Sequence, residues 1–130
     1  MKFAGIDYGT QRVGVAISDA GGTIAFPRIV LHNDAGLIDA LTTLLQKESV
    51  KCVVVGDTRS HGSKENPVTV RLTSFIAKLE GAGFRVKSMW EAWSSIEASR
   101  YAPEQKSHDD AAAAAIILQR YLDIHAPAVE

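Results

Sequence analysis

The sequence lacks the features that define several large classes of protein. Its 130 residues include a single cysteine and four prolines, and 14 basic side chains nearly cancel 15 acidic ones. One cysteine excludes a disulfide framework, and no apolar run approaches the roughly 20 residues of a membrane helix. We therefore expect a cytoplasmic protein with no membrane partner. Since the formal charge is only −1, nucleic-acid binding would need a local basic patch.

Length and composition fit one folding unit. The chain is 46% hydrophobic and 22% charged, as in ordinary globular proteins. A chain of this length buries about two thirds of its unfolded surface, which is enough for a core without disulfides. We therefore predict a single domain over residues 1–130, with Cys52 buried inside the apolar run "KCVVVG".

In the first half of the chain the spacing of apolar residues changes from that of strands to that of a helix. Apolar residues alternate in "KFAGIDY", "RVGVAISDA" and "GTIAFPRIVL", which predicts three strands in an antiparallel meander. Leucines at helical spacing then predict an amphipathic helix from Asp34 to about Glu48, with Asn33 and Asp34 as candidate caps.

The second half alternates strands and helices. "KCVVVGD" and "FRVKSMW" predict strands, and a helix is expected between them, from Pro67 to the "GAG" that ends at Gly83. "SSIEASRYA" predicts a helical segment and "DDAAAAAIILQRYLDIH" a final helix. The order predicts an α/β fold, with three antiparallel strands followed by parallel ones and helices on the faces of a mixed sheet.

Acidic residues stand where ligands gather in such sheets, beyond the carboxyl ends of the strands. Asp7 closes the first strand, Asp57 follows the fourth and Glu91 follows the fifth. Asp110 opens the last helix on a stripe expected to face the sheet. Unpaired carboxylates repel one another, and Mg²⁺ or Mn²⁺, which prefer oxygen ligands, would resolve that repulsion. We interpret the acids as a candidate site for metal-dependent phosphodiester hydrolysis.

Each acid also has a structural interpretation. Asp7 could cap the turn at Gly9 and Thr10. Asp110 lies three residues after Ser107, a spacing that resembles a capping box. Glu91 alone could be a solvated surface residue. These alternatives stay open at the level of the sequence.

Several motifs together resemble one family. "GIDYGTQRVGVAISD", "VVVG" with a later "GS", "SSIEA" and "DDAAAAAIILQRYLD" are similar, in order, to the motifs of the YqgF or RuvX-like family. Its members are RNase H-like proteins described as Holliday junction resolvases and pre-16S rRNA nucleases. The resemblance implies an RNase H-like fold and places the family's metal-binding acids at Asp7, Glu91 and Asp110. It places the family's basic residue of the first turn at Arg12, and it assigns no role to Asp57.

The resemblance implies a metal-dependent endonuclease acting on structured nucleic acid, either an rRNA precursor or branched DNA. A two-fold symmetric junction would favour a homodimer. We predict that three residues in the loops after the first and fourth strands form a local basic rim for the phosphate backbone: Arg12, Arg59 and Lys64.

Two other functions are considered. Trp90 and Ala92 stand where the family commonly has an aspartate and an arginine, which favours a nucleic-acid or ribosome-associated binder with weakened catalysis. "IDYGT" also resembles the phosphate loop of actin-like ATPases. Those enzymes close two such domains around ATP, so 130 residues argue against that interpretation.

Overall fold

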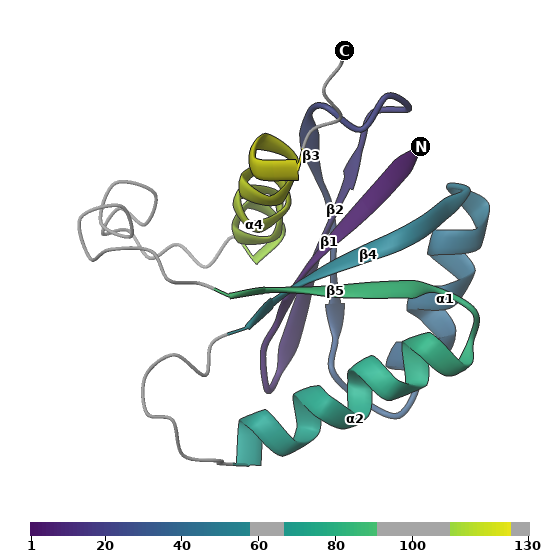
Figure 1. Ribbon diagram of the computed structural model, residues 1–130. Coiled ribbons are helices and arrows are strands. Elements are labelled where there is room, and N and C mark those ends of the chain that lie inside the picture. Colours follow the sequence, from purple (N-terminus) through teal and green to yellow (C-terminus); the bar gives the residue numbers. More distant parts are fainter. Residues whose placement is uncertain (58–66, 91–109, 126–130) are drawn as a thin grey trace.

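The computed structural model describes residues 1–57, 67–90 and 110–125. Five strands and three helices lie in these ranges (Figure 1). In chain order they are β1 (Lys2–Tyr8), β2 (Arg12–Ser18), β3 (Ala25–His32), α1 (Leu37–Lys47), β4 (Val50–Asp57), α2 (Pro67–Gly81), β5 (Arg85–Trp90) and α4 (Asp110–His125).

The strands form one mixed sheet in the order β3-β2-β1-β4-β5. β2 pairs antiparallel with both β1 and β3, whereas β4 pairs parallel with both β1 and β5. The predicted meander followed by parallel strands is therefore confirmed. Because β1, β4 and β5 run in the same direction, their carboxyl ends meet at one edge of the sheet, which we call the carboxyl edge.

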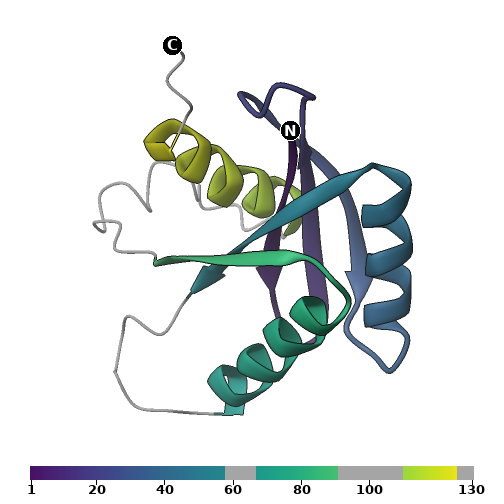
Figure 2. The same cartoon turned by 45° about the vertical axis from the view of Figure 1, so that its right-hand side comes forward.

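Helices cover both faces of the sheet, as predicted. α1 and α2 lie on one face and α4 lies on the other, across β1, β2 and β3 (Figures 1 and 2). Alternate residues of a strand point to opposite faces, so each strand supplies both layers. In β1, Ala4 and Ile6 pack toward α1 and α2, and Phe3 packs toward α4.

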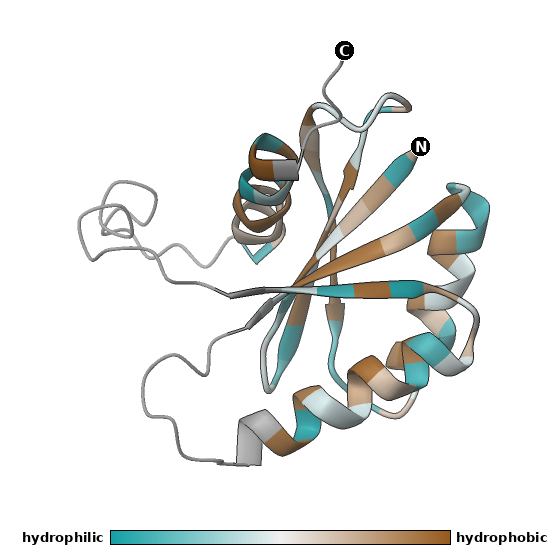
Figure 3. Cartoon of the chain, in the orientation of Figure 1, coloured by the Kyte–Doolittle hydropathy of each residue, from teal (hydrophilic) through white to brown (hydrophobic). Residues whose placement is uncertain are grey.

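The layer under α1 and α2 is built from large aliphatic side chains. Leu41 and Leu45 of α1 are fully buried against Val53 and Val55 of β4. In Figure 3 the apolar residues run along the central strands and hydrophilic residues colour much of the outer helix surfaces. No helix in the described part of the chain is long and apolar enough to span a membrane.

The start of the first helix differs from the sequence-based expectation, and one expected helical segment lies outside the described residues. The first helix begins at Leu37 and not at Asp34, because the Asp34 carboxylate accepts a hydrogen bond from the Gly36 amide at 2.9 Å and holds a turn ahead of the helix. Neither Asn33 nor Asp34 is its N-cap, which is Gly36. The expected helical segment at 94–102 lies outside the described residues. Cys52 is buried, as predicted.

Candidate active site

Asp7 lies in β1, one residue before the strand ends at the carboxyl edge. Its register partner in β2 is Gly14, and directly opposed residues of an antiparallel pair share a face of the sheet. Gly5 is two residues earlier in β1 and faces α4, where a Cβ would lie 2.6 Å from the Cβ of Leu118. The carboxylate of Asp7 therefore lies on the face covered by α4.

Gly14 lets the first turn of α4 approach the sheet. A Cβ at this position would overlap the backbone carbonyl oxygen of Asp110, so only glycine accommodates the helix here. Asp110 is the first residue of α4. The pairing of Asp7 with Gly14 and the contact of Gly14 with Asp110 together bring the two acids to one place.

Arg12 is the cation beside this acidic pair. Its Nε donates to Oδ2 of Asp110 at 3.1 Å, and the side chains of Arg12 and Asp110 are 51% and 27% exposed. Arg12 is also the first residue of β2, directly after the turn that joins it to β1. The guanidinium thus pairs with Asp110, the second acid of the pair.

The pKa of Asp7 reflects its surroundings. Burial of the carboxylate, and secondarily the negative charge of Asp110, raise this pKa from 3.8 to about 6. Within the described residues the Asp7 carboxylate has no hydrogen-bond donor, and none joins it to Gly9 or Thr10. The turn-capping interpretation of Asp7 therefore has no hydrogen bond to support it.

Asp19 shows the contrasting case of a satisfied carboxylate in the same motif. It accepts hydrogen bonds from the backbone amides of Ile24 at 3.0 Å and Thr23 at 2.7 Å, and from the Thr23 hydroxyl at 2.8 Å. These donors, the Ile24 amide first, lower the pKa of Asp19 to about 2. Asp19 stabilises a turn, whereas Asp7 is a partly buried acid whose carboxylate has no hydrogen-bond donor among the described residues.

The other predicted site residues are not placed by the structure. Glu91, Arg59 and Lys64 lie outside the described residues, as does Ser107. Asp57 is the last residue of β4 and pairs with Trp90 in the backbone register, but its side chain also lies outside the description. In the ranges that are described, no group of three or more metal-ligating side chains occurs. The structure brings together Asp7, Asp110 and Arg12.

Gly14 is a site residue that the sequence reasoning missed. The signal was present, because a glycine inside the apolar strand "RVGVAIS" often marks close approach of another backbone. The identity of the approaching element, α4, is not contained in that local pattern.

The fold belongs to a class known from solved structures. RuvC of Thermus thermophilus, in complex with a Holliday junction, superposes with a TM-score of 0.62 over 95% of this chain and 94% of that one, at 17% identity. The fowlpox virus resolvase, also in complex with Holliday junction DNA, gives a TM-score of 0.61 over 98% of this chain and 100% of that one, at 14% identity. At these identities the likeness shows the fold, which is that of RuvC-like, RNase H-fold resolvases.

Sequence relatives identify the family. The family model described as "RuvX: Holliday junction resolvase" matches residues 1–124. A relative from Chlorobaculum tepidum, named as a candidate pre-16S rRNA nuclease, is 35% identical over 95% of this chain and 94% of its own length. Another relative with the same name, from Bordetella petrii, is 36% identical over 90% of this chain and 91% of its own length. The chain belongs to the RuvX family, and the predicted fold, family and nuclease class are confirmed.

Proposed function

We propose that this chain is a divalent-metal-dependent endonuclease that hydrolyses phosphodiester bonds in structured nucleic acid, with Asp7, Asp110 and Glu91 as its catalytic acids. The observation that carries the proposal is the meeting of Asp7 and Asp110 at the carboxyl edge. A partly buried carboxylate without hydrogen-bond donors among the described residues, beside a second carboxylate, destabilises the fold unless a cation compensates it.

The donor set fits a hard cation. Carboxylate oxygens are the ligands that Mg²⁺ and Mn²⁺ prefer. Burial, and secondarily the charge of Asp110, raise the pKa of Asp7, and a bound cation would stabilise the ionised carboxylate against both effects. Asp7 and Asp110 would hold it, with Glu91, the residue directly after β5, as the proposed third ligand. A bound ion in such a site polarises phosphoryl oxygens and lowers the pKa of a bound water.

The chain's own residues would prepare the site for this ion. Gly14 fixes the distance between the acids by letting α4 rest on β2. Arg12 holds the Asp110 carboxylate at 3.1 Å, and its guanidinium, half exposed, is available to a phosphate oxygen. Arg59 and Lys64 belong to the proposed basic rim, and Asp57 is a weaker candidate acid, because no family motif supports it.

The first substrate to test is an rRNA precursor. Full-length relatives at 35% and 36% identity carry that activity in their names, whereas the family description names a junction. Processing of an rRNA precursor would place the protein in the cytoplasm, and cleavage of a symmetric junction would favour a homodimer. A binder with weakened catalysis is the second candidate, favoured by Trp90 and Ala92 beside Glu91.

Asp7→Asn is the decisive variant. The amide keeps the size of the side chain but is a poor ligand for a hard cation, so we expect metal-dependent cleavage of pre-rRNA or junction DNA to fall at least about 100-fold. Binding of nucleic acid in chelator should persist. Millimolar Mn²⁺ should raise the melting temperature of the wild type and leave that of Asp7→Asn nearly unchanged.

The matched control is Asp123→Asn, since Asp123 is an exposed acid in the last turns of α4. This variant should cleave like the wild type. Cleavage by Asp7→Asn at the wild-type rate would contradict the catalytic assignment. A wild type that binds but cuts none of the substrates would favour the binder.

A further inference from the structure

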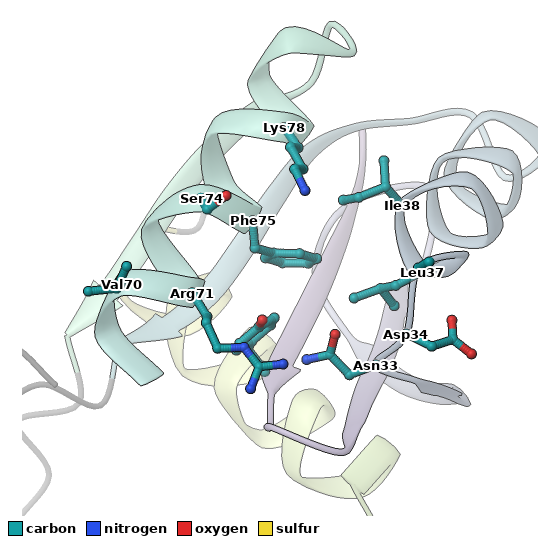
Figure 4. A pocket seen from close by; sticks show the side chains of 11 residues that line it. Asn33, Asp34, Leu37, Ile38, Val70, Arg71, Ser74, Phe75 and Lys78 are labelled. Atoms are coloured by element: carbon teal, nitrogen blue, oxygen red, sulfur yellow. The ribbon is translucent and has the colours of Figure 1, made fainter. Parts of the chain in front are cut away.

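A groove opens on the opposite face of the sheet from the acidic pair. It lies between α2 and the segment that leads into α1, and its volume is about 580 Å³, within the range of about 300–1,000 Å³ typical of ligand pockets. Phe75 of α2 lies at its centre, between Lys78 and Arg71 on one side and Leu37 on the other (Figure 4). We call it the α1–α2 groove.

Two cations of α2 face this groove. Arg71 and Lys78 are both exposed, and Figure 4 shows the guanidinium of Arg71 directed toward the amide of Asn33 and the amine of Lys78 directed into the groove. Neither side chain makes an ion pair with a described residue. The groove therefore presents positive charge that the described part of the protein does not neutralise.

Among the described residues that line the groove, Asp34 is the only acid. Its Oδ1 accepts the Gly36 amide at 2.9 Å, and in Figure 4 its carboxylate points away from Arg71 and Lys78. Ser74, one turn from each cation on α2, and Asn33 add neutral polar groups. This combination of two cations with hydroxyl and amide donors is what binds phosphate oxygens.

The groove is continuous with the carboxyl edge that carries the acids. Tyr8, which lines the groove, follows Asp7 in β1, so the two side chains leave the same end of one strand on opposite faces. The side-chain Nδ2 of Asn33 donates to the carbonyl oxygen of Gly9 at 2.8 Å, and its backbone N–H donates to the carbonyl oxygen of Gln11 at 2.9 Å. The wall of the groove is thereby attached to the turn between β1 and β2.

The spacing of the cations suits the phosphates of a helical strand. Lys78 follows Arg71 by seven positions, which is about 10 Å along a helix and equals the rise of about three nucleotides of a helical strand. The ring centroids of Tyr8 and Phe75 lie 4.8 Å apart at the floor, where Phe75 is buried and Tyr8 is partly exposed, so the floor beneath the two cations is apolar and the phosphate contacts come from its rim.

We infer that the α1–α2 groove binds the phosphodiester backbone of the nucleic-acid substrate away from the cleaved bond, with Arg71 and Lys78 contacting phosphates. The inference rests on the proposed function, since it takes the ligand of the groove to be the substrate of the acidic pair. A substrate strand passing around the β1–β2 turn would engage both sites.

The test is salt-dependent binding in the presence of a chelator. We expect Arg71→Gln/Lys78→Gln to weaken binding of a labelled pre-rRNA fragment at least about tenfold, and to reduce the slope of log K against log salt by about 1.4–1.8, for two lost phosphate contacts. The matched control removes the same charge from two exposed lysines, Lys47 at the end of α1 and Lys51 at the start of β4. These lie at the opposite edge, so Lys47→Gln/Lys51→Gln should keep both affinity and slope.

The outcomes separate the groove from the nuclease. Equal affinity and slope for the groove and control variants, in a protein that still cleaves, would overturn the groove alone. A wild type that binds no nucleic acid would overturn both proposals, and weakened binding by the groove variant of a protein that never cleaves would support the groove alone.

Adenosine monophosphate and inorganic phosphate serve as competitors. Tight binding of either in the groove, with no effect of the variants on nucleic-acid binding, would make the groove a small-anion site and overturn the inference. Arg71→Lys keeps the charge, so its salt slope should stay close to that of the wild type. Thermal unfolding checks that every variant is folded.

Discussion

The two faces of the sheet are packed by opposite means. Under α1 and α2 the contact is between large side chains, such as Leu41 and Val55, whereas under α4 glycine and alanine bring the helix backbone close to the strands, as at Gly5 and Gly14. Truncating a large side chain leaves a cavity, whereas a backbone contact leaves no space for an added methyl group. The face that places Asp110 beside Asp7 is the one with the closer backbone contact.

The largest effect is expected from removing volume under α1. Leu41 is fully buried, so Leu41→Ala should lower the free energy of unfolding by roughly 3–4 kcal/mol through lost burial and the cavity left behind. Urea denaturation measures this change. Gln46→Ala, at an exposed position of the same helix, should stay within about 0.5 kcal/mol of the wild type. A loss below about 1 kcal/mol in Leu41→Ala would mean that this layer is loosely packed.

The next effect comes from adding volume under α4. In Gly14→Ala the new methyl meets the backbone of Asp110, so we expect a loss of about 2–3 kcal/mol in the free energy of unfolding. Since Asp110 is displaced, we also expect a loss of the proposed metal-dependent cleavage. Gly81→Ala is the control, because a Cβ there meets nothing within 4 Å. It should be neutral or stabilise by about 0.5 kcal/mol. Equal stability of the two variants would contradict the seating of α4 on β2.

The same difference between the faces explains what the sequence could predict. Period-two alternation and helical leucine spacing are local patterns, so the five strands, the three helices that the structure describes, apart from the start of α1, and the burial of Cys52 followed from them. Asp7 stood out as a lone acid in an apolar strand. The neighbourhood of Asp7, Gly14 and Asp110 joins the β1–β2 hairpin to the start of α4, far along the chain, by backbone contact, which no local pattern specifies.

The α1–α2 groove was missed for a related reason. Asn33 was expected to cap a helix, but its amide instead donates to Gly9, so it joins the groove to the β1–β2 turn. Arg71 and Lys78 are ordinary exposed residues of an amphipathic helix in sequence. Their meaning depends on which segment lies across the groove from them.

The third prediction concerns the charge of Asp7 under the close-fitting helix. Because the pKa of Asp7 is about 6 in the folded protein against an ordinary 3.8, the folded state binds more protons than the unfolded state between these values. The metal-free protein should therefore lose roughly 2–3 kcal/mol of stability from this group as pH rises from 4 to 6, and no more above that range.

Asp7→Asn isolates this contribution from those of other acids. In chelator, its free energy of unfolding should equal that of the wild type near pH 3.5 and exceed it by roughly 2–3 kcal/mol at pH 7. Urea denaturation across this pH series is the measurement. A constant difference between the two proteins over the whole range would show that the fold does not raise the pKa of Asp7.

The smallest stability effect is expected at Arg12, where the two roles of a surface charge can be separated. The ion pair of Arg12 with Asp110 is partly exposed, so Arg12→Gln should cost only about 0.5 kcal/mol of unfolding free energy, whereas binding of nucleic acid should weaken and lose about one phosphate contact from its salt slope. Arg28→Gln is the matched control, because Arg28 makes a comparably exposed ion pair with Glu48 at 3.4 Å, and Glu48 directly follows α1 at the opposite edge of the sheet. It should lose similar stability and bind nucleic acid like the wild type. If the two variants bind equally well, Arg12 acts only on Asp110 and does not contact the substrate.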